Sequence, residues 1–195
     1  MTPDRPLRAD AARNRYALLK AASEEFAAHG LDASVADIAR RAGIGKGTVF
    51  RHFPTKDVLL AAVVLDRIDG LALLARELLT DPDPGAALLE FMEAAAGRQR
   101  QLDLSFLRDA GGVNDLLDDT RSELFTAITA LVDRAKEAGA VRPDITGMDV
   151  ILLMCAPNYV VGFVPDAPPD LWRRYLGIIF DGLRPEGARP LPSVS

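Results

Sequence analysis

Apolar residues recur every three or four positions along most of the chain, which is the period of an amphipathic α-helix. The first clear repeat, Leu18, Ala22 and Phe26, predicts a helix over residues 9–29 that ends at Gly30. No segment shows the alternation of apolar and polar residues that predicts a half-buried β-strand. The pattern therefore predicts an all-α protein.

Prolines, glycines and capping residues divide the periodic chain into successive helices. Thr55 is placed to cap a helix that runs to about residue 79, and Asp83 followed by Pro84 begins the next one. The remaining helices are predicted at residues 35–42, 45–52, 102–110, 115–138, 146–162 and 168–183. Apolar residues make up 49% of the 195 residues, which is enough for a sizeable core.

Two short predicted helices lie on either side of a tight turn between Ser34 and Lys56. Ser34 is in the position of an N-cap, and Gly43 ends the first helix because glycine tolerates a positive φ. On the second helix, the pattern turns Val49 and Phe53 inward. It leaves a small, polar and basic face outward, formed by Lys46, Thr48, Arg51 and His52. Such a face is what a helix needs to contact the DNA major groove.

At these residues the chain resembles the DNA-binding domain of the TetR family of transcriptional regulators. The resemblance covers residues 15–60, about 45 of the 195 residues, in the family's order and spacing. Three positions depart from the usual pattern, since Phe50 and His52 stand where the family most often has Tyr, and Gly45 replaces a common Ser. The matching residues are Leu18, Leu19, Ala21, Ala22, Phe26, Gly30, Asp37, Ile38, Ala39, Ala42, Gly43, Ile44, Gly47, Thr48, Val49, Phe50, His52, Phe53, Thr55, Lys56, Asp57 and Leu59.

The resemblance implies about nine helices, with an N-terminal three-helix DNA-binding domain and a C-terminal helical domain for ligand binding and dimerisation. We expect a flexible arm at residues 1–8, the helix-turn-helix domain at 9–57, the C-terminal domain at 58–184, and a flexible tail at 185–195. We expect double-stranded DNA with a pseudo-palindromic operator as the partner. The expected contacts are Ser34, Lys46, Thr48, Phe50, Arg51, His52, Thr55 and Lys56.

Lys56 is an unusual residue for the start of a helix, because the positive end of the helix dipole disfavours a cation. A DNA phosphate near Thr55, Lys56 and the free backbone N–H groups would explain it. The resemblance implies the same role for this lysine. Arg40 and Arg41 fit a solvated face as well as a DNA contact, and Glu24 and Glu25 are predicted to form a solvated face.

In the C-terminal domain, large apolar side chains suit a pocket for an apolar or amphipathic effector, which the resemblance places among the helices of this domain. The candidate lining residues are Phe91, Met92, Phe106, Leu107, Phe125, Met154 and Asn158. The helices at 146–162 and 168–183 are apolar on more than one face, which predicts a two-fold homodimer. The candidate interface residues are Ile151, Met154, Trp172, Tyr175, Ile179 and Phe180.

The net charge of −5 is unevenly distributed. Residues 1–57 hold ten Lys or Arg against seven Asp or Glu, whereas residues 58–195 hold thirteen against twenty-one. The basic part coincides with the helix-turn-helix, as DNA binding requires. No apolar run approaches the ~20 residues of a membrane span. With one cysteine and no signal-peptide core at the N-terminus, we expect a cytoplasmic protein without an internal disulfide.

Catalysis finds little support in the residue types. Only two histidines are present, no glycine-rich loop follows a strand, and Cys155 is predicted to be a buried, unreactive thiol. We expect no metal and no cofactor.

Three classes of function nevertheless remain open: a ligand-responsive repressor, a DNA-binding regulator that answers only to a protein partner, and an enzyme or helical interaction module. We favour the first. A mobility-shift assay on the promoter beside the gene separates the third class from the others, and a thermal-shift screen of apolar molecules separates the first two.

Overall fold

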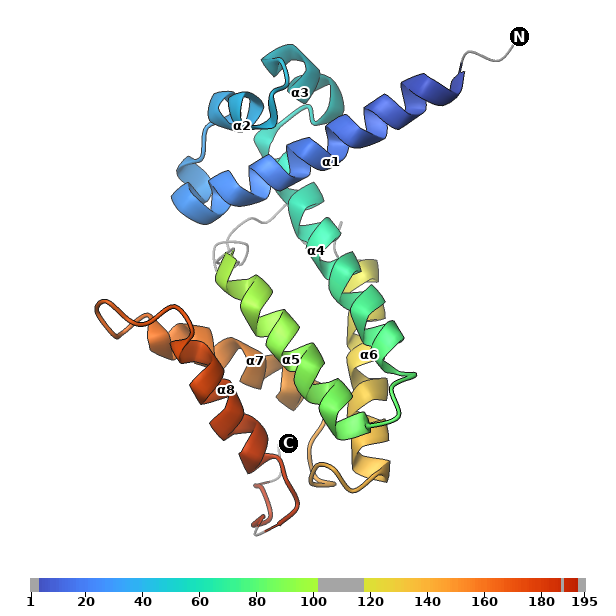
Figure 1. Ribbon diagram of the computed structural model, residues 1–195, viewed down its shortest axis with the longest axis vertical. Helices are drawn as coiled ribbons and strands as arrows, with labels where there is room; N and C mark the ends of the chain where they lie inside the picture. The colour runs from blue at the N-terminus through green and yellow to red at the C-terminus, as the bar shows by residue number, and fades with distance from the viewer. Residues whose placement is uncertain (1–3, 102–117, 187, 193–195) are drawn as a thin grey trace. The chain divides into compact units, whose positions relative to one another are not determined.

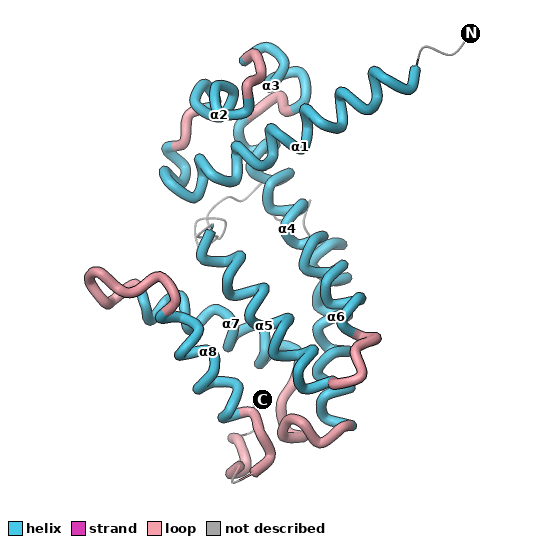
Figure 2. The backbone as a smooth tube through the Cα atoms, viewed as in Figure 1, coloured by secondary structure: helices cyan, strands magenta, loops and turns pink. Residues whose placement is uncertain are grey.

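The computed structural model describes residues 4–101, 118–186 and 188–192, which are helix, turn or loop with no strand among them (Figure 2). The all-α prediction is confirmed. The described residues form eight α-helices and one short 3₁₀-helix, close to the nine expected (Figure 1). The helix predicted at residues 102–110 lies outside the described residues. The elements are α1 (Asp4–His29), η1 (Gly30–Asp32), α2 (Val35–Ala42), α3 (Lys46–His52), α4 (Lys56–Leu78), α5 (Pro84–Gln101), α6 (Asp118–Glu137), α7 (Gly147–Val161) and α8 (Leu171–Gly182).

The first helix begins at Asp4, earlier than the start expected near residue 9. Residues 4–8 therefore continue α1 and do not form an arm ahead of it. Pro6 is compatible with this start, because it lies in the first turn, where the backbone N–H groups have no intrahelical partner.

The local capping predictions are confirmed by the hydrogen bonds. The Ser34 hydroxyl oxygen accepts from the Ala36 N–H at 3.1 Å, and Gly43 ends α2 with a φ of 66°. The Thr55 hydroxyl oxygen accepts from the Val58 N–H at 3.2 Å at the start of α4. At the start of α5, one Asp83 carboxylate oxygen accepts from two backbone N–H groups, at 3.0 and 2.9 Å. These caps are local interactions, so the sequence is sufficient to predict them.

The chain divides into two compact units, which we describe separately. The first is Met1–Arg67 with Gln101–Asp118, and the second is Ile68–Arg100 with Asp119–Ser195. The division falls inside α4, ten residues after the boundary expected between residues 57 and 58. The functional limits of the two domains stay a prediction.

In the first unit, α2 contacts both α1 and α3 (Figure 1). Its core is formed by apolar residues from all of its helices, because each short helix has only one face to bury. The buried residues include Leu18, Ala22 and Phe26 of α1, Ile38 and Ala39 of α2, Val49 of α3, Phe53, and Leu59 and Leu60 of α4.

The core of the second unit is a larger apolar cluster drawn from α4 to α8. Helices α7 and α8 contact each other and contribute to it (Figure 1). Its members include Ala75, Leu78, Leu88, Phe91, Met92, Ile128, Leu131, Val132, Val150, Met154, Trp172, Leu176 and Phe180. Among the described helices, none is both long enough and apolar enough to cross a membrane.

Candidate nucleic-acid interface

Helix α3 presents the outward face that the sequence predicts. It starts at Lys46 after Gly45, whose extended backbone forms the N-cap, and it buries Val49 in the first unit. Lys46, Phe50 and Arg51 are exposed, whereas Thr48 and His52 are half-buried. Seven residues with one buried apolar anchor and two exposed cations form a short helix that is suited to a DNA groove.

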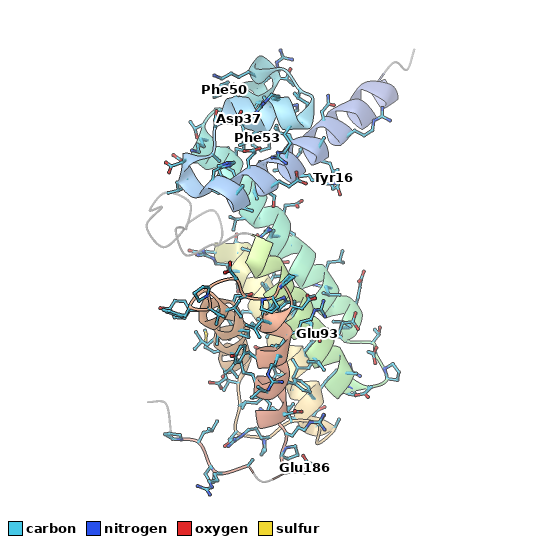
Figure 3. All side chains as sticks on the ribbon, turned by 60° about the vertical axis from the view of Figure 1, so that its left-hand side comes forward. Tyr16, Asp37, Phe50, Phe53, Glu93 and Glu186 are labelled. Atoms are coloured by element: carbon cyan, nitrogen blue, oxygen red, sulfur yellow. The ribbon has the colours of Figure 1, made fainter. Side chains whose placement is uncertain are left out.

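Phe50 and Phe53 differ sharply although they are only three residues apart (Figure 3). Phe53 is buried, and the Arg15 guanidinium of α1 lies 5.0 Å from the centre of its ring. Phe50 is 43% exposed. An exposed aromatic ring on this helix has no role in the core of the unit, so it is available for contact with DNA. Without a hydroxyl, it can offer apolar contact but no hydrogen bond to phosphate.

The start of α4 carries the predicted phosphate-binding residues. Lys56 is half-buried, and its Nζ donates to the backbone carbonyl of Leu31. This internal hydrogen bond ties the start of α4 to the η1 turn, which is a structural reason for a lysine at this position. The Ser34 and Thr55 hydroxyl oxygens accept from backbone N–H groups, and each hydroxyl keeps its own proton for donation.

Glu25 corrects one expectation from the sequence, and Arg41 is its partner. Glu25 does not belong to a solvated face, since it is only 5% exposed. One of its carboxylate oxygens accepts from Arg41 Nε at 2.6 Å, and the other lies 3.2 Å from His29 Nδ1. Arg41 also forms an ion pair with Glu24, in which Nη1 lies 3.1 Å from a carboxylate oxygen. The hydrogen bonds to Glu25 and Glu24 raise the pKa of Arg41.

Arg41 therefore links α2 to α1 through two carboxylates, with its side chain 47% exposed. The sequence contained a signal for this pair. Glu25 follows Leu18 by seven residues, so it lies on the apolar face of α1. A carboxylate on such a face needs a buried partner. By contrast, Arg40 stays exposed and pairs with Asp37 of its own helix.

The residues predicted to line an effector pocket separate into three groups. Phe91, Met92 and Met154 are buried in the core of the second unit. Phe125 on α6 is 40% exposed and does not join the core, whereas its neighbour Leu124 packs against the core. Phe106 and Leu107 lie outside the described residues.

Asn158 is the polar residue among these candidates. Its Nδ2 donates to the backbone carbonyl of Ala96 on α5 at 2.7 Å. Its Oδ1 is buried and has no hydrogen-bond partner among the described residues. Buried polar groups in proteins are nearly always paired, so this oxygen marks an unfilled acceptor inside the second unit.

Three of the six residues predicted for the dimer interface are buried within their own chain. Met154, Trp172 and Phe180 are buried in the core of their own chain, and Ile151 and Ile179 pack against that core. Trp172 lies against α5, since its ring is 3.6 Å from the position a Cβ would take at Gly97. The buried residues thus stabilise the unit itself. Tyr175 is half-buried.

A different stripe of α7 remains exposed. We call it the α7 stripe: Met148, Leu152, Cys155 and Tyr159, at intervals of four, three and four residues on one face of the helix. Leu152 is 63% exposed and Tyr159 is 73% exposed, and Tyr159 makes an edge contact with Phe163 at 5.3 Å between ring centres. Ile178 of α8 is also exposed. Cys155 is therefore exposed, not buried as predicted.

No three His, Cys, Asp or Glu side chains come together as a metal site in the part of the chain that the structure describes.

The all-α fold and the exposed basic helix define the class of protein: a helix-turn-helix DNA-binding regulator. Two family models match the chain. Residues 18–63 match the model of bacterial regulatory proteins of the tetR family, and residues 83–185, just over half of the chain, match the SbtR-like transcriptional regulator C-terminal domain. The chain belongs to the TetR family of transcriptional regulators.

Solved structures and curated relatives agree with this membership. The chain is 36% identical to a TetR transcription regulatory protein from Mycobacterium vanbaalenii, with a TM-score of 0.71 over 92% of this chain and 99% of that one. It is 30% identical to the TetR regulator SCO0520 from Streptomyces coelicolor, with a TM-score of 0.69 over 88% and 98% of the two chains. A Mycobacterium tuberculosis relative named HTH-type transcriptional repressor Rv1474c is 28% identical over 89% of this chain and 81% of its own length.

Proposed function

We propose that this protein is a homodimeric repressor that leaves a pseudo-palindromic operator when a small apolar or amphipathic molecule binds its second unit. The observation that carries the proposal is Asn158 Oδ1, a buried acceptor without a partner among the described residues, on a side chain bonded to Ala96 of the apolar core. The basic face of α3 supports the DNA-binding part, and the name of the Rv1474c relative supports repression. We expect the protein to act in the cytoplasm, without catalytic activity and without a cofactor.

The proposed DNA contacts divide into two groups. Lys46 and Thr48, near the start of α3, contact base edges, because the first residues of a recognition helix usually enter the groove. Arg51, His52, Ser34, Thr55 and Lys56 contact phosphates, with Phe50 packing beside the DNA. Base contacts determine sequence preference, whereas phosphate contacts add affinity on every sequence.

Two lysine variants test this division. Lys46→Ala should lower the preference for operator over random DNA by about 1–3 kcal/mol. Lys56→Ala should weaken binding to both DNAs and reduce the salt dependence by about one ion. Lys20→Ala, on the exposed part of α1, is a matched control for the loss of one positive charge. Equal effects of both variants on operator and random DNA would refute the proposed roles.

The α7 stripe and Ile178 are the proposed dimer surface, because exposed apolar residues on two adjacent helices can pack against a second copy. Light scattering should give twice the chain mass of 21.0 kDa at micromolar concentration. Leu152→Glu should produce monomers, since it places a charge in the contact. Leu73→Glu, at another exposed leucine of the second unit, should leave the dimer intact. A monomeric wild type would rule out this part of the proposal.

The ligand must bind more tightly to a conformation in which the two α3 helices of the dimer no longer match one DNA helical turn of ~34 Å. A thermal-shift screen identifies ligands, because a molecule that binds only the folded state raises Tm. Each ligand found is then added to a mobility-shift assay with the DNA upstream of the gene. Release of the operator is expected. If no stabilising ligand changes operator binding, the repressor is not ligand-controlled.

A further inference from the structure

The side-chain amide of Asn158 has a fixed orientation. Its Nδ2 donates to the carbonyl oxygen of Ala96 at 2.7 Å. Reversing the amide would place two oxygens at that distance with no proton between them, which is repulsive. The unpartnered atom is therefore the oxygen, and what it lacks is a hydrogen-bond donor.

The backbone beside Asn158 also offers an acceptor and no donor. Pro157, inside α7, has no N–H, so the carbonyl of Leu153 lacks its usual helical partner. On the facing helix α5, the described side chains next to the Ala96 carbonyl are those of Ala95 and Ala96, which contain no polar atom. The group that completes this region must supply a proton.

The described surroundings of that group are apolar. Residues of α5, α7 and α8 belong to the core cluster of the second unit. Among the described residues, the ion pair of Glu93 with Arg173 at 3.7 Å is at the surface, with side chains 43% and 56% exposed. These surroundings suit a ligand with an apolar body.

We infer that Asn158 Oδ1 is the polar anchor for an effector that carries a hydroxyl or amide N–H donor on an apolar body. The inference rests on the proposed function and adds the chemical class of the ligand. A carboxylate or an ether has only acceptors to offer. Alcohols, phenols and amides with an apolar body meet both conditions.

Two matched series of small molecules test the inference. One is 4-butylphenol, 4-butylanisole and 4-butylbenzoate, and the other is 1-octanol, octyl methyl ether and octanoate. Binding is followed by the fluorescence of Trp172, the single tryptophan, whose ring lies against Gly97, next to Ala96. Phenol and alcohol should bind the wild type about tenfold more tightly than the ether of the same series, with the carboxylate weaker still.

Asn158→Leu should remove the preference for donors, so that phenol and ether bind alike. Thr126→Val is the matched control. It removes a polar side chain on α6 that is already bonded to the Ser122 carbonyl at 2.9 Å, and it should retain the preference.

Equal binding of donor and ether to the wild type, or a preference that survives in Asn158→Leu, would overturn the inference. So would failure of all six compounds to bind. The proposed function is judged separately, by whether any ligand from an unbiased screen releases the operator. A ligand that releases the operator but lacks a donor would refute the inference and leave the proposed function standing.

Discussion

Glu25 in the first unit and Asn158 in the second both carry a buried side-chain oxygen, and the two differ in whether that oxygen has a partner among the described residues. In the first unit, both oxygens of Glu25 lie close to nitrogens, from Arg41 and His29. In the second, one half of the Asn158 amide is bonded and the other half is not. Among the described residues, Glu25 therefore has its partners within the first unit, whereas Asn158 Oδ1 in the second has none. This difference is expected if the first unit must hold a fixed shape and the second must respond to a ligand.

The largest effect should come from the apolar core of the second unit. Phe91→Ala removes a fully buried ring and should lower the free energy of unfolding by about 3–5 kcal/mol, because a cavity remains. Phe125→Ala changes an exposed ring and should cost less than about 1 kcal/mol. Chemical denaturation of both variants measures the contrast. Similar losses would show that Phe125 also belongs to the core.

The next largest loss of stability should come from removing the Glu25 carboxylate in the first unit. Glu25→Ala leaves Arg41 and His29 without their shared acceptor and should cost about 1–3 kcal/mol. Replacing both members, as in Glu25→Leu with Arg41→Leu, should recover much of the loss, because the charge left without Arg41, that of Glu24, is exposed to water. A double variant as unstable as Glu25→Ala alone would show that the charges themselves are needed.

A smaller effect on stability should appear at low pH in the second unit, where Arg142 pairs with Asp144. Two hydrogen bonds from the buried Arg142, at 2.6 and 2.8 Å, lower the pKa of Asp144. A carboxylate whose pKa is lower in the folded state stabilises the protein above its unfolded pKa of about 3.9, and this contribution is lost as the pH falls below that value. Asp144→Asn should therefore lower Tm by a few degrees at pH 7 and flatten the decline of Tm in acid. An unchanged acid decline would exclude the pair as its cause.

The same pair also bonds to part of the segment for which a flexible tail is expected. Arg142 also donates to the carbonyl of Arg189, and Asp144 accepts from the Leu191 N–H at 3.2 Å. Residues 189–191 are thus bonded to the segment between α6 and α7. Proline-rich composition alone predicts no such contact, since the partners lie 47 positions earlier in the chain.

The smallest effect should be that of Asn158→Leu without ligand. This change removes one hydrogen bond and one unpaired acceptor together, so the free energy of unfolding should change by less than about 1 kcal/mol. The contrast with Glu25→Ala is the direct comparison of the two units. A large loss from Asn158→Leu would mean that the oxygen is already paired in the free protein.

The sequence predicts local features well and distant pairings poorly. The caps at Ser34, Thr55 and Asp83 depend on residues within three positions of each helix start, and all three are confirmed. The partner of Glu25 lies sixteen residues away on another helix, and only the position of Glu25 on an apolar face indicated that a partner was needed.

The candidate dimer surface shows a second limit. Helices α7 and α8 are apolar on several faces, so periodicity does not distinguish the residues that the chain buries itself from those it leaves exposed. Trp172 and Phe180 enter the core, whereas Leu152 and Ile178 stay at the surface. The choice depends on how α7 and α8 pack against α5, which involves contacts between distant segments.

Amide hydrogen exchange with and without 4-butylphenol tests most directly whether the ligand binds at Asn158 in the second unit and leaves the Glu25 contacts of the first unit unchanged. The account predicts slower exchange in α5 around Ala96 and in α7 around Asn158 when the phenol is bound, because a filled site suppresses local opening. It predicts no added protection in α1 and α2 around Glu25 and Arg41, whose polar contacts are already complete. Protection that appears around Glu25 and Arg41 but not around Asn158 would contradict the account.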